Sequence, residues 1–156
     1  MKKFKFSLTH HDETLRTLVE QTEHKTLGIW ARDCALRVLP YFMDEHPADS
    51  RPRQALDVLQ AWIDTGDFKM AVIRKASLDA HAAAREVGED NPARSAARAA
   101  GQAVATAHVC THSMGASNYA LQAVHRAASS AQAEAAVAAE LTWQIQHLLE
   151  LRGRAG

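Results

Sequence analysis

The chain has 156 residues, with 18 Lys and Arg against 18 Asp and Glu, and 47% of its residues are apolar. This length suits one domain and excludes a second domain of ordinary size. The balanced charge disfavours nucleic acid as the main partner, because binding to nucleic acid depends on an excess of cations that releases counterions.

Alanine dominates the apolar residues, and the chain has only 7 Gly and 4 Pro. Alanine loses little entropy in a helix, and its small side chain lets neighbouring helices approach closely. We therefore expect an all-α fold, a single-domain bundle of six or seven helices over residues 1–156 with alanine-rich, closely packed central helices. Residues 1–10 and 152–156 are expected to be poorly ordered or peripheral.

Apolar residues recur at helical spacing along most of the chain, and caps and breakers divide them into segments. The expected helices cover about 12–23, 27–42, 52–65, 67–87, 92–115 and 116–151. Pro40 should end or kink the second helix, and residues 129–130 are a plausible break in the last one. Gly66, Gly88 and Gly115 are expected to mark the ends of the helices that precede them.

Two features indicate a cytoplasmic protein. The N-terminal residues contain no apolar export segment, and residues 99–125 carry no charged residue but include three His, two Thr and Asn118, which is unlike a membrane span. Cys34 and Cys110 lie far apart in the sequence. We expect both to be reduced, with Cys34 buried and inaccessible as a small apolar residue.

His108 and His112 lie four residues apart. On a helix their side chains would point the same way and could bind one divalent metal. Such a site needs a third ligand from another helix, and the Glu of an HExxH motif is absent. The alternative is that both are ordinary polar histidines in a cavity or on the surface. No cofactor is predicted.

Helical phase places polar residues along three helix edges that border apolar seams. Asp33 and Arg37 share one edge. The other two edges hold Arg74, His81, Arg98, His108 and His112. Charges at such borders are partly desolvated, so they must be paired or must hold a ligand. We expect one polar site between helices, either a structural network or a pocket for a carboxylate or phosphate.

Residues 46–53 join two helices and are rich in charge and proline. A proline stiffens this loop beside Arg51 and Arg53, which lowers the entropy lost when the loop makes a contact. We therefore expect the loop to be the first choice for a partner-binding face. The alternative is that its arginines pair with Asp49 or Asp57.

Catalytic signatures are missing from the sequence. It has no Gly-x-Ser-x-Gly motif, no glycine-rich phosphate loop and no Cys with a recognisable His partner motif. We expect the protein not to be an enzyme. A binding module needs only a complementary surface.

Four segments carry a resemblance to a known family. They are residues 30–40 (WARDCALRVLP), 51–55 (RPRQA) followed by Trp62, 96–109 (AARAAGQAVATAHV) and 115–120 (GASNYA). Over roughly residues 27–126 the chain resembles the immunity-five-like family, an all-helical bacterial family associated with polymorphic toxin systems. The ordered combination of Trp, Cys, Arg-Pro-Arg and His carries the resemblance, because alanine-rich matches alone are unspecific.

This resemblance implies a cytoplasmic protein that binds and neutralises a cognate toxin by stoichiometric protein–protein interaction. The expected partner is then a toxin protein, with no nucleic acid and no membrane, and a homo-oligomer is left open. The residues themselves support an alternative, a helical bundle that binds a small ligand or metal, or even an enzyme, through the His/Arg site.

Overall fold

The computed structural model of the protein describes residues 3, 6 and 12–155, and within this part of the chain every regular element is an α-helix. The predicted all-α fold is confirmed. The helices are α1 (Glu13–Glu20), α2 (His24–Met43), α3 (Arg51–Thr65), α4 (Met70–Glu86), α5 (Pro92–Ala105), α6 (His112–Ala127) and α7 (Ala133–Ala155). None of these helices is long and apolar enough to cross a membrane.

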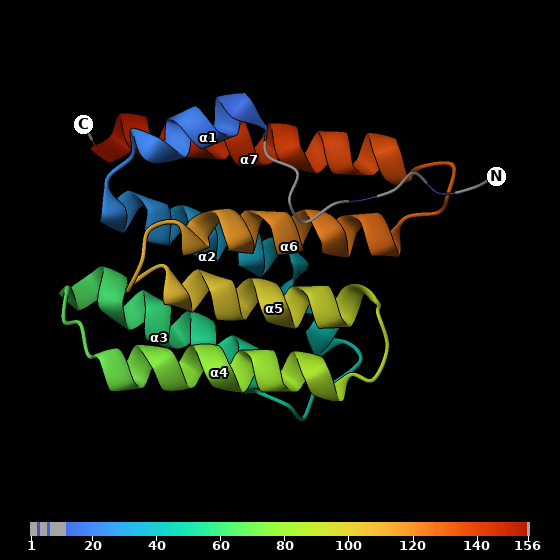
Figure 1. Ribbon diagram of the computed structural model, residues 1–156, viewed down its shortest axis with the longest axis horizontal. Coiled ribbons are helices and arrows are strands. Elements are labelled where there is room, and N and C mark those ends of the chain that lie inside the picture. Colours follow the sequence, from blue (N-terminus) through green and yellow to red (C-terminus); the bar gives the residue numbers. More distant parts are fainter. Residues whose placement is uncertain (1–2, 4–5, 7–11, 156) are drawn as a thin grey trace.

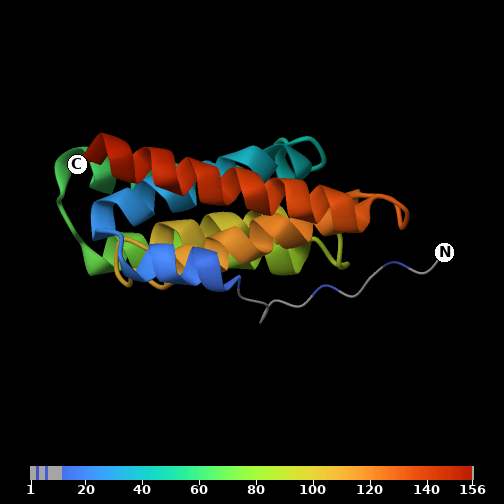
Figure 2. The same cartoon turned by 90° about the horizontal axis from the view of Figure 1, so that it is seen from above.

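The helices form two layers, as Figures 1 and 2 show. One layer contains α7, α2 and α3, and the other contains α6, α5 and α4, while α1 packs against α7. Helices α2 and α5 face each other at the centre of the molecule. Helix α4 lies at one edge, where it packs against α3 and α5. The other described residues therefore leave the outer face of α4 uncovered.

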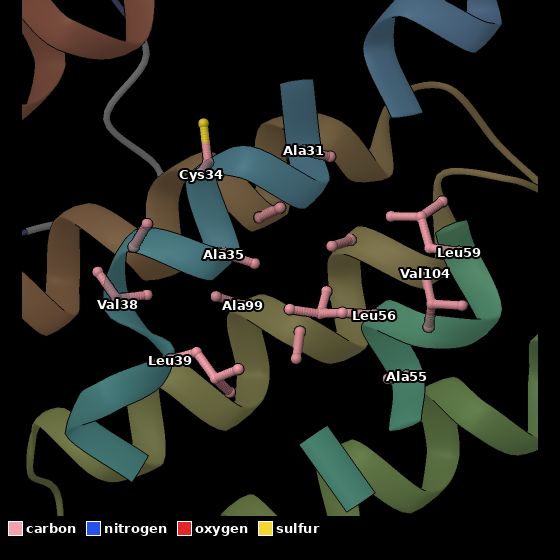
Figure 3. Packing of buried hydrophobic residues seen from close by; sticks show 14 of the residues in the cluster. Ala31, Cys34, Ala35, Val38, Leu39, Ala55, Leu56, Leu59, Ala99 and Val104 are labelled. Atoms are coloured by element: carbon pink, nitrogen blue, oxygen red, sulfur yellow. The ribbon is translucent and has the colours of Figure 1, made fainter. Parts of the chain in front are cut away.

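Small side chains fill much of the core between the layers. Figure 3 shows α2, α3 and α5 meeting through residues such as Ala35, Leu56 and Ala99. Larger side chains complete the core further along α2, where Trp30 is fully buried and its indole Nε1 donates a hydrogen bond of 2.9 Å to the Gln144 carbonyl oxygen. This bond satisfies the polar end of the indole, so burying the ring leaves no unpaired donor.

Helices α4 and α5 meet through their smallest residues. Ala80 and Ala84 of α4 are fully buried, and Gly101 of α5 is buried against the His81 ring of α4. The Ser77 hydroxyl of α4 donates a 2.9 Å hydrogen bond to the Gly101 carbonyl oxygen in the backbone of α5. A short side chain can reach the backbone of the neighbouring helix only where both helices carry small residues at the contact. The predicted alanine-rich central helices are confirmed.

Several predicted helix ends are confirmed by their caps. The Asp12 carboxylate accepts a 3.0 Å hydrogen bond from the Leu15 N–H at the start of α1. Pro92 opens α5. Gly66 has φ 72° at the end of α3, and Gly88, with φ 87°, lies just beyond α4. A residue with a side chain is strained in this left-handed conformation, and glycine is not.

The predicted end of α5 differs from the structure. Helix α2 continues through Pro40 to Met43, close to the predicted end at residue 42, and Phe42 in its last turn is fully buried. Helix α5 ends at Ala105, and Gly115 lies inside α6 instead of ending the helix before it. At the C-terminus, residues 152–155 form the last turn of α7, and most of residues 1–10 lie outside the described part of the chain.

Both cysteines are free, and Cys34 is fully buried as predicted. Burial raises the pKa of the Cys34 thiol, and the nearby Glu140 and Asp33 carboxylates raise it further. Cys110 is half-buried in the segment between α5 and α6.

Candidate functional site

A hollow of about 310 Å³ opens between α4 and the segment that joins α5 to α6. We name it the histidine pocket and define it by its lining residues, which are Met70, Ile73, Arg74, Ser77, Leu78, Ala105, His108 and His112. Residues three or four apart on a helix share a face, so α4 supplies one continuous wall. Most of the lining is apolar, and no acidic side chain belongs to it.

His112 is the first residue of α6. Its Nδ1–H donates a 2.8 Å hydrogen bond to the Gln102 amide oxygen on α5. Gly115 leaves the space for this amide, because a Cβ atom at position 115 would lie 2.6 Å from the Gln102 Oε1 atom. Burial lowers the pKa of His112, with a smaller contribution from His108. The imidazole of His112 is therefore neutral at pH 7.

His108 lies in the segment between α5 and α6, outside any helix. Its ring stacks on Phe68 of the α3–α4 connection, with the ring centroids 5.9 Å apart and the planes at 22°. Two connecting segments thus meet at the rim of the pocket. The prediction that His108 and His112 share one face of a helix is wrong, because the helix ends before His108.

The end of α5 depends on a contact with α2. The last carbonyl groups of a helix have no partner within it and need a donor from elsewhere. His24, at the start of α2, places its Nε2 atom 2.5 Å from the Thr106 carbonyl oxygen, and its ring packs on Trp62 with centroids 4.8 Å apart. His24 therefore holds the turn that carries His108. No pattern near His24 in the sequence indicates this role.

His81 of α4 and Arg98 of α5 form a pair across the α4–α5 contact. The Arg98 Nη1 group donates a 3.2 Å hydrogen bond to His81 Nδ1. Burial lowers the pKa of His81 to about 4, and the positive charge of Arg98 adds to the effect. The His81 ring lies against Gly101, where a Cβ atom would come within 2.7 Å of it. His81 is therefore a neutral acceptor packed between the helices.

Asp33 and Arg37 of α2 bind residues of α7. The Asp33 carboxylate lies 2.7 Å from His147 Nε2. The Arg37 guanidinium donates two hydrogen bonds to the Glu140 carboxylate, of 2.7 and 2.9 Å, and lies 3.9 Å from the centroid of the Trp143 ring. Trp143 also stacks on His147, with centroids 4.6 Å apart. We name these five residues the α2–α7 network.

The predicted polar cluster is therefore divided into two groups. Arg74, His108 and His112 line the histidine pocket, and the His81–Arg98 pair adjoins it. Asp33 and Arg37 belong instead to the α2–α7 network. The prediction of a single site is wrong, because helical phase gives the edge on which a residue lies but not the helix that faces that edge.

Arg51 and Arg53 differ in their surroundings. Arg51 donates hydrogen bonds to both oxygens of the Asp49 carboxylate, at 2.9 and 2.7 Å, and lies 2.5 Å from a carboxylate oxygen of Glu86. The Arg51 guanidinium lowers the pKa of Asp49. Arg51 thus joins the start of α3 to the end of α4, while Arg53 is exposed. The sequence left open whether Arg51 contacts a partner or pairs with a nearby carboxylate, and in the structure Arg51 pairs with Asp49.

The described residues do not form a metal centre. They contain no group of three or more His, Cys, Asp or Glu side chains that could hold a metal ion. His112 uses Nδ1 to bind Gln102, and His108 stacks on Phe68. The two histidines do not form a chelating pair on one helix.

Large apolar side chains lie exposed around the first turns of α4. We name them the α4 apolar surface, and with their exposed fractions they are Phe68 (43%), Met70 (43%), Val72 (48%) and Leu78 (55%). The histidine pocket borders this surface on one side. A second hollow, of about 280 Å³, lies between α3 and α4, and its lining includes Val72 of this surface and Ile73, which also lines the histidine pocket. In the sequence, only Val72 and Leu78 signal this surface, because they are apolar residues of α4 outside the predicted apolar seam.

Comparison with known families places the chain in one of them. The family described as "Imm-5 like putative immunity protein" matches residues 17–151. The match covers nearly the whole described helical domain, from α1 to α7. The chain belongs to this immunity-protein family. Searches of curated proteins and of solved structures gave no match.

Proposed function

We propose that the protein is an immunity protein that binds a cognate toxin stoichiometrically, in the cytoplasm, and blocks its activity. Membership in the immunity-protein family supports the general role. The binding mode rests on one observation, the α4 apolar surface, where Phe68 and three large apolar side chains of the edge helix α4 are exposed to solvent. Contiguous exposed apolar side chains on a folded domain commonly mark a protein interaction site.

The surface has the anatomy of a protein interface. Its apolar centre is flanked by two hollows, which could receive side chains of a partner. Charged residues of both signs line these hollows, with Asp67 and Lys69 in the second hollow and Arg74 in the histidine pocket. Such a rim does not imitate the uniform negative charge of nucleic acid. The proposed partner surface is therefore mainly apolar with mixed charge.

The test requires the partner, which we would seek among the proteins encoded beside this chain. Each would be co-produced with the protein, and copurification in a fixed ratio together with protection of cells from the toxin is the expected result. If no neighbouring product copurifies or is neutralised, the proposal of an immunity function is wrong.

The binding face is tested with matched substitutions. Val72→Asp and Leu78→Asp each place a charge in the α4 apolar surface and should weaken toxin binding about tenfold or more. Leu149→Asp is the control, because Leu149 of α7 is similarly exposed, at 49%, and lies outside this surface. All three variants should keep the thermal stability of the parent. Equal binding by Val72→Asp, Leu78→Asp and the parent would exclude this face.

A further inference from the structure

We propose that the histidine pocket binds a small organic acid, a monocarboxylate with an apolar chain or ring. This goes beyond toxin neutralisation and does not depend on it. The pocket lies at the junction of α4, the end of α5 and the start of α6. Its volume, its lining and its charge each restrict the kind of ligand that fits.

The volume and the lining indicate a small, mainly apolar ligand. The hollow of about 310 Å³ lies at the lower end of the ~300–1,000 Å³ typical of small-molecule sites. Met70, Ile73, Leu78 and Ala105 supply its apolar walls. A chain of several methylene groups or a single ring would bury its surface against these side chains.

The charge of the pocket comes from Arg74. Among the described residues, Arg74 has no hydrogen-bond or ion-pair partner, in contrast to Arg37, Arg51, Arg94 and Arg98. No acidic side chain lines the pocket to neutralise it. Ser77 donates its hydroxyl to Gly101 and is already engaged. An anionic group in the pocket would therefore meet the Arg74 guanidinium as its main donor.

A single guanidinium favours a carboxylate over a phosphate. Phosphate sites usually combine several donors, often the free N–H groups at the start of a helix. At the start of α6 these groups are occupied, because the N–H groups of His112, Ser113 and Met114 donate to carbonyl oxygens of residues 109–111. One planar guanidinium matches the two oxygens of a carboxylate. The ligand class is therefore an apolar acid with one carboxylate.

The experiment is a titration of the purified protein with octanoate, followed by NMR of methyl groups and histidine rings. Octanol and octylammonium serve as matched probes, because they carry the same chain with a neutral or a positive head group. Arg74→Gln removes the proposed anchor. Arg85→Gln is the control variant, since Arg85 is an exposed arginine of the same helix that does not line the pocket.

We expect octanoate to shift the signals of Ile73, Leu78 and His108 with an affinity in the millimolar range, as befits a ligand of this size. Arg74→Gln should weaken binding about fivefold and Arg85→Gln less than twofold. Octanol and octylammonium should bind at least about fivefold more weakly than octanoate.

Three results would overturn the inference: no shifts at the pocket, equal binding of the three probes, or equal affinity of Arg74→Gln and the parent. Circular dichroism and a thermal melt confirm that Arg74→Gln is folded, which the exposure of Arg74 leads us to expect. The immunity function is judged separately by copurification and cell protection, so either proposal can fail while the other stands.

Discussion

The α2–α7 network and the histidine pocket contain similar residue types, arginine and histidine beside an aromatic ring. In the network, Arg37 binds Glu140 and His147 binds Asp33, so each charged group has a partner. In the pocket, Arg74 faces apolar side chains without a partner among the described residues. Paired groups hold helices together, whereas an unpaired cation at an apolar hollow is available to a ligand.

The first prediction tests this difference through stability. Arg37→Ala leaves the Glu140 carboxylate, whose side chain is 10% exposed, without its cation, and should lower the free energy of unfolding by about 2–3 kcal/mol. Arg74→Ala should change it by less than about 0.5 kcal/mol. Urea denaturation measures both. Adding Glu140→Gln to Arg37→Ala should restore part of the loss. Equal effects of the two arginine variants would remove the distinction between the regions.

The second prediction compares two alanines of α5. Ala100 is fully buried in the core, so Ala100→Leu should cost about 1–3 kcal/mol by overpacking. Ala105 lines the histidine pocket and is half-buried, so Ala105→Leu should fill the hollow and cost less than about 0.5 kcal/mol. Thermal melts of both variants check this. An Ala100→Leu protein as stable as the parent would contradict the close packing of the core around α5.

The third prediction concerns pH and the His81–Arg98 pair beside the pocket. The folded pKa of His81 is about 4, below its ordinary value near 6.5. As pH falls from about 6.5 to 4, the unfolded chain gains a proton on His81 that the folded chain does not. The free energy of unfolding should therefore decrease over this interval, by about 1–2 kcal/mol once solvent screening is considered, and His112 acts in the same direction.

The control for this pH dependence is His81→Gln, because the glutamine side chain can still accept a hydrogen bond from Arg98 but does not titrate. Other groups titrate in the same interval, so the difference between the two stability profiles isolates His81. Parallel profiles for the parent and His81→Gln between pH 6.5 and 4 would show that His81 is not the cause.

The fourth prediction compares the reactivity of the two cysteines, Cys34 near the α2–α7 network and Cys110 near the histidine pocket. Cys34 neighbours Asp33 and is fully buried with a raised thiol pKa, whereas Cys110 is half-buried near the pocket. Thiolate is the reactive form, so native labelling should modify Cys110 and leave Cys34 intact until the protein unfolds. Mass spectrometry of Cys34→Ala and Cys110→Ala proteins assigns the site. Rapid labelling of Cys34 in the folded protein would contradict its place in the core.

Local signals predicted the helices well, because helix formation depends on neighbours in the sequence. Alanine content and apolar spacing gave the all-α fold, and Asp12, Pro92, Gly66 and Gly88 mark ends where they were expected. The site was less predictable. Helical phase placed Arg74 beside His81 correctly on α4, but it grouped Asp33 with them, although Asp33 binds His147 at a sequence separation of 114.

Composition, apolar spacing and short-range capping were enough to predict the class of fold, the approximate extent of the helices and the burial of Cys34, because these features depend on residues close together in the sequence. The end of α5 and the pairing of the polar groups depend instead on contacts between distant segments. Residues 99–111 have ordinary helical propensity, and the turn after Ala105 instead involves His24, at a sequence separation of 82 from Thr106. Gly115 likewise serves the close approach of α6 to Gln102 instead of ending a helix. Such contacts depend on how helices distant in the sequence pack, which no local pattern encodes.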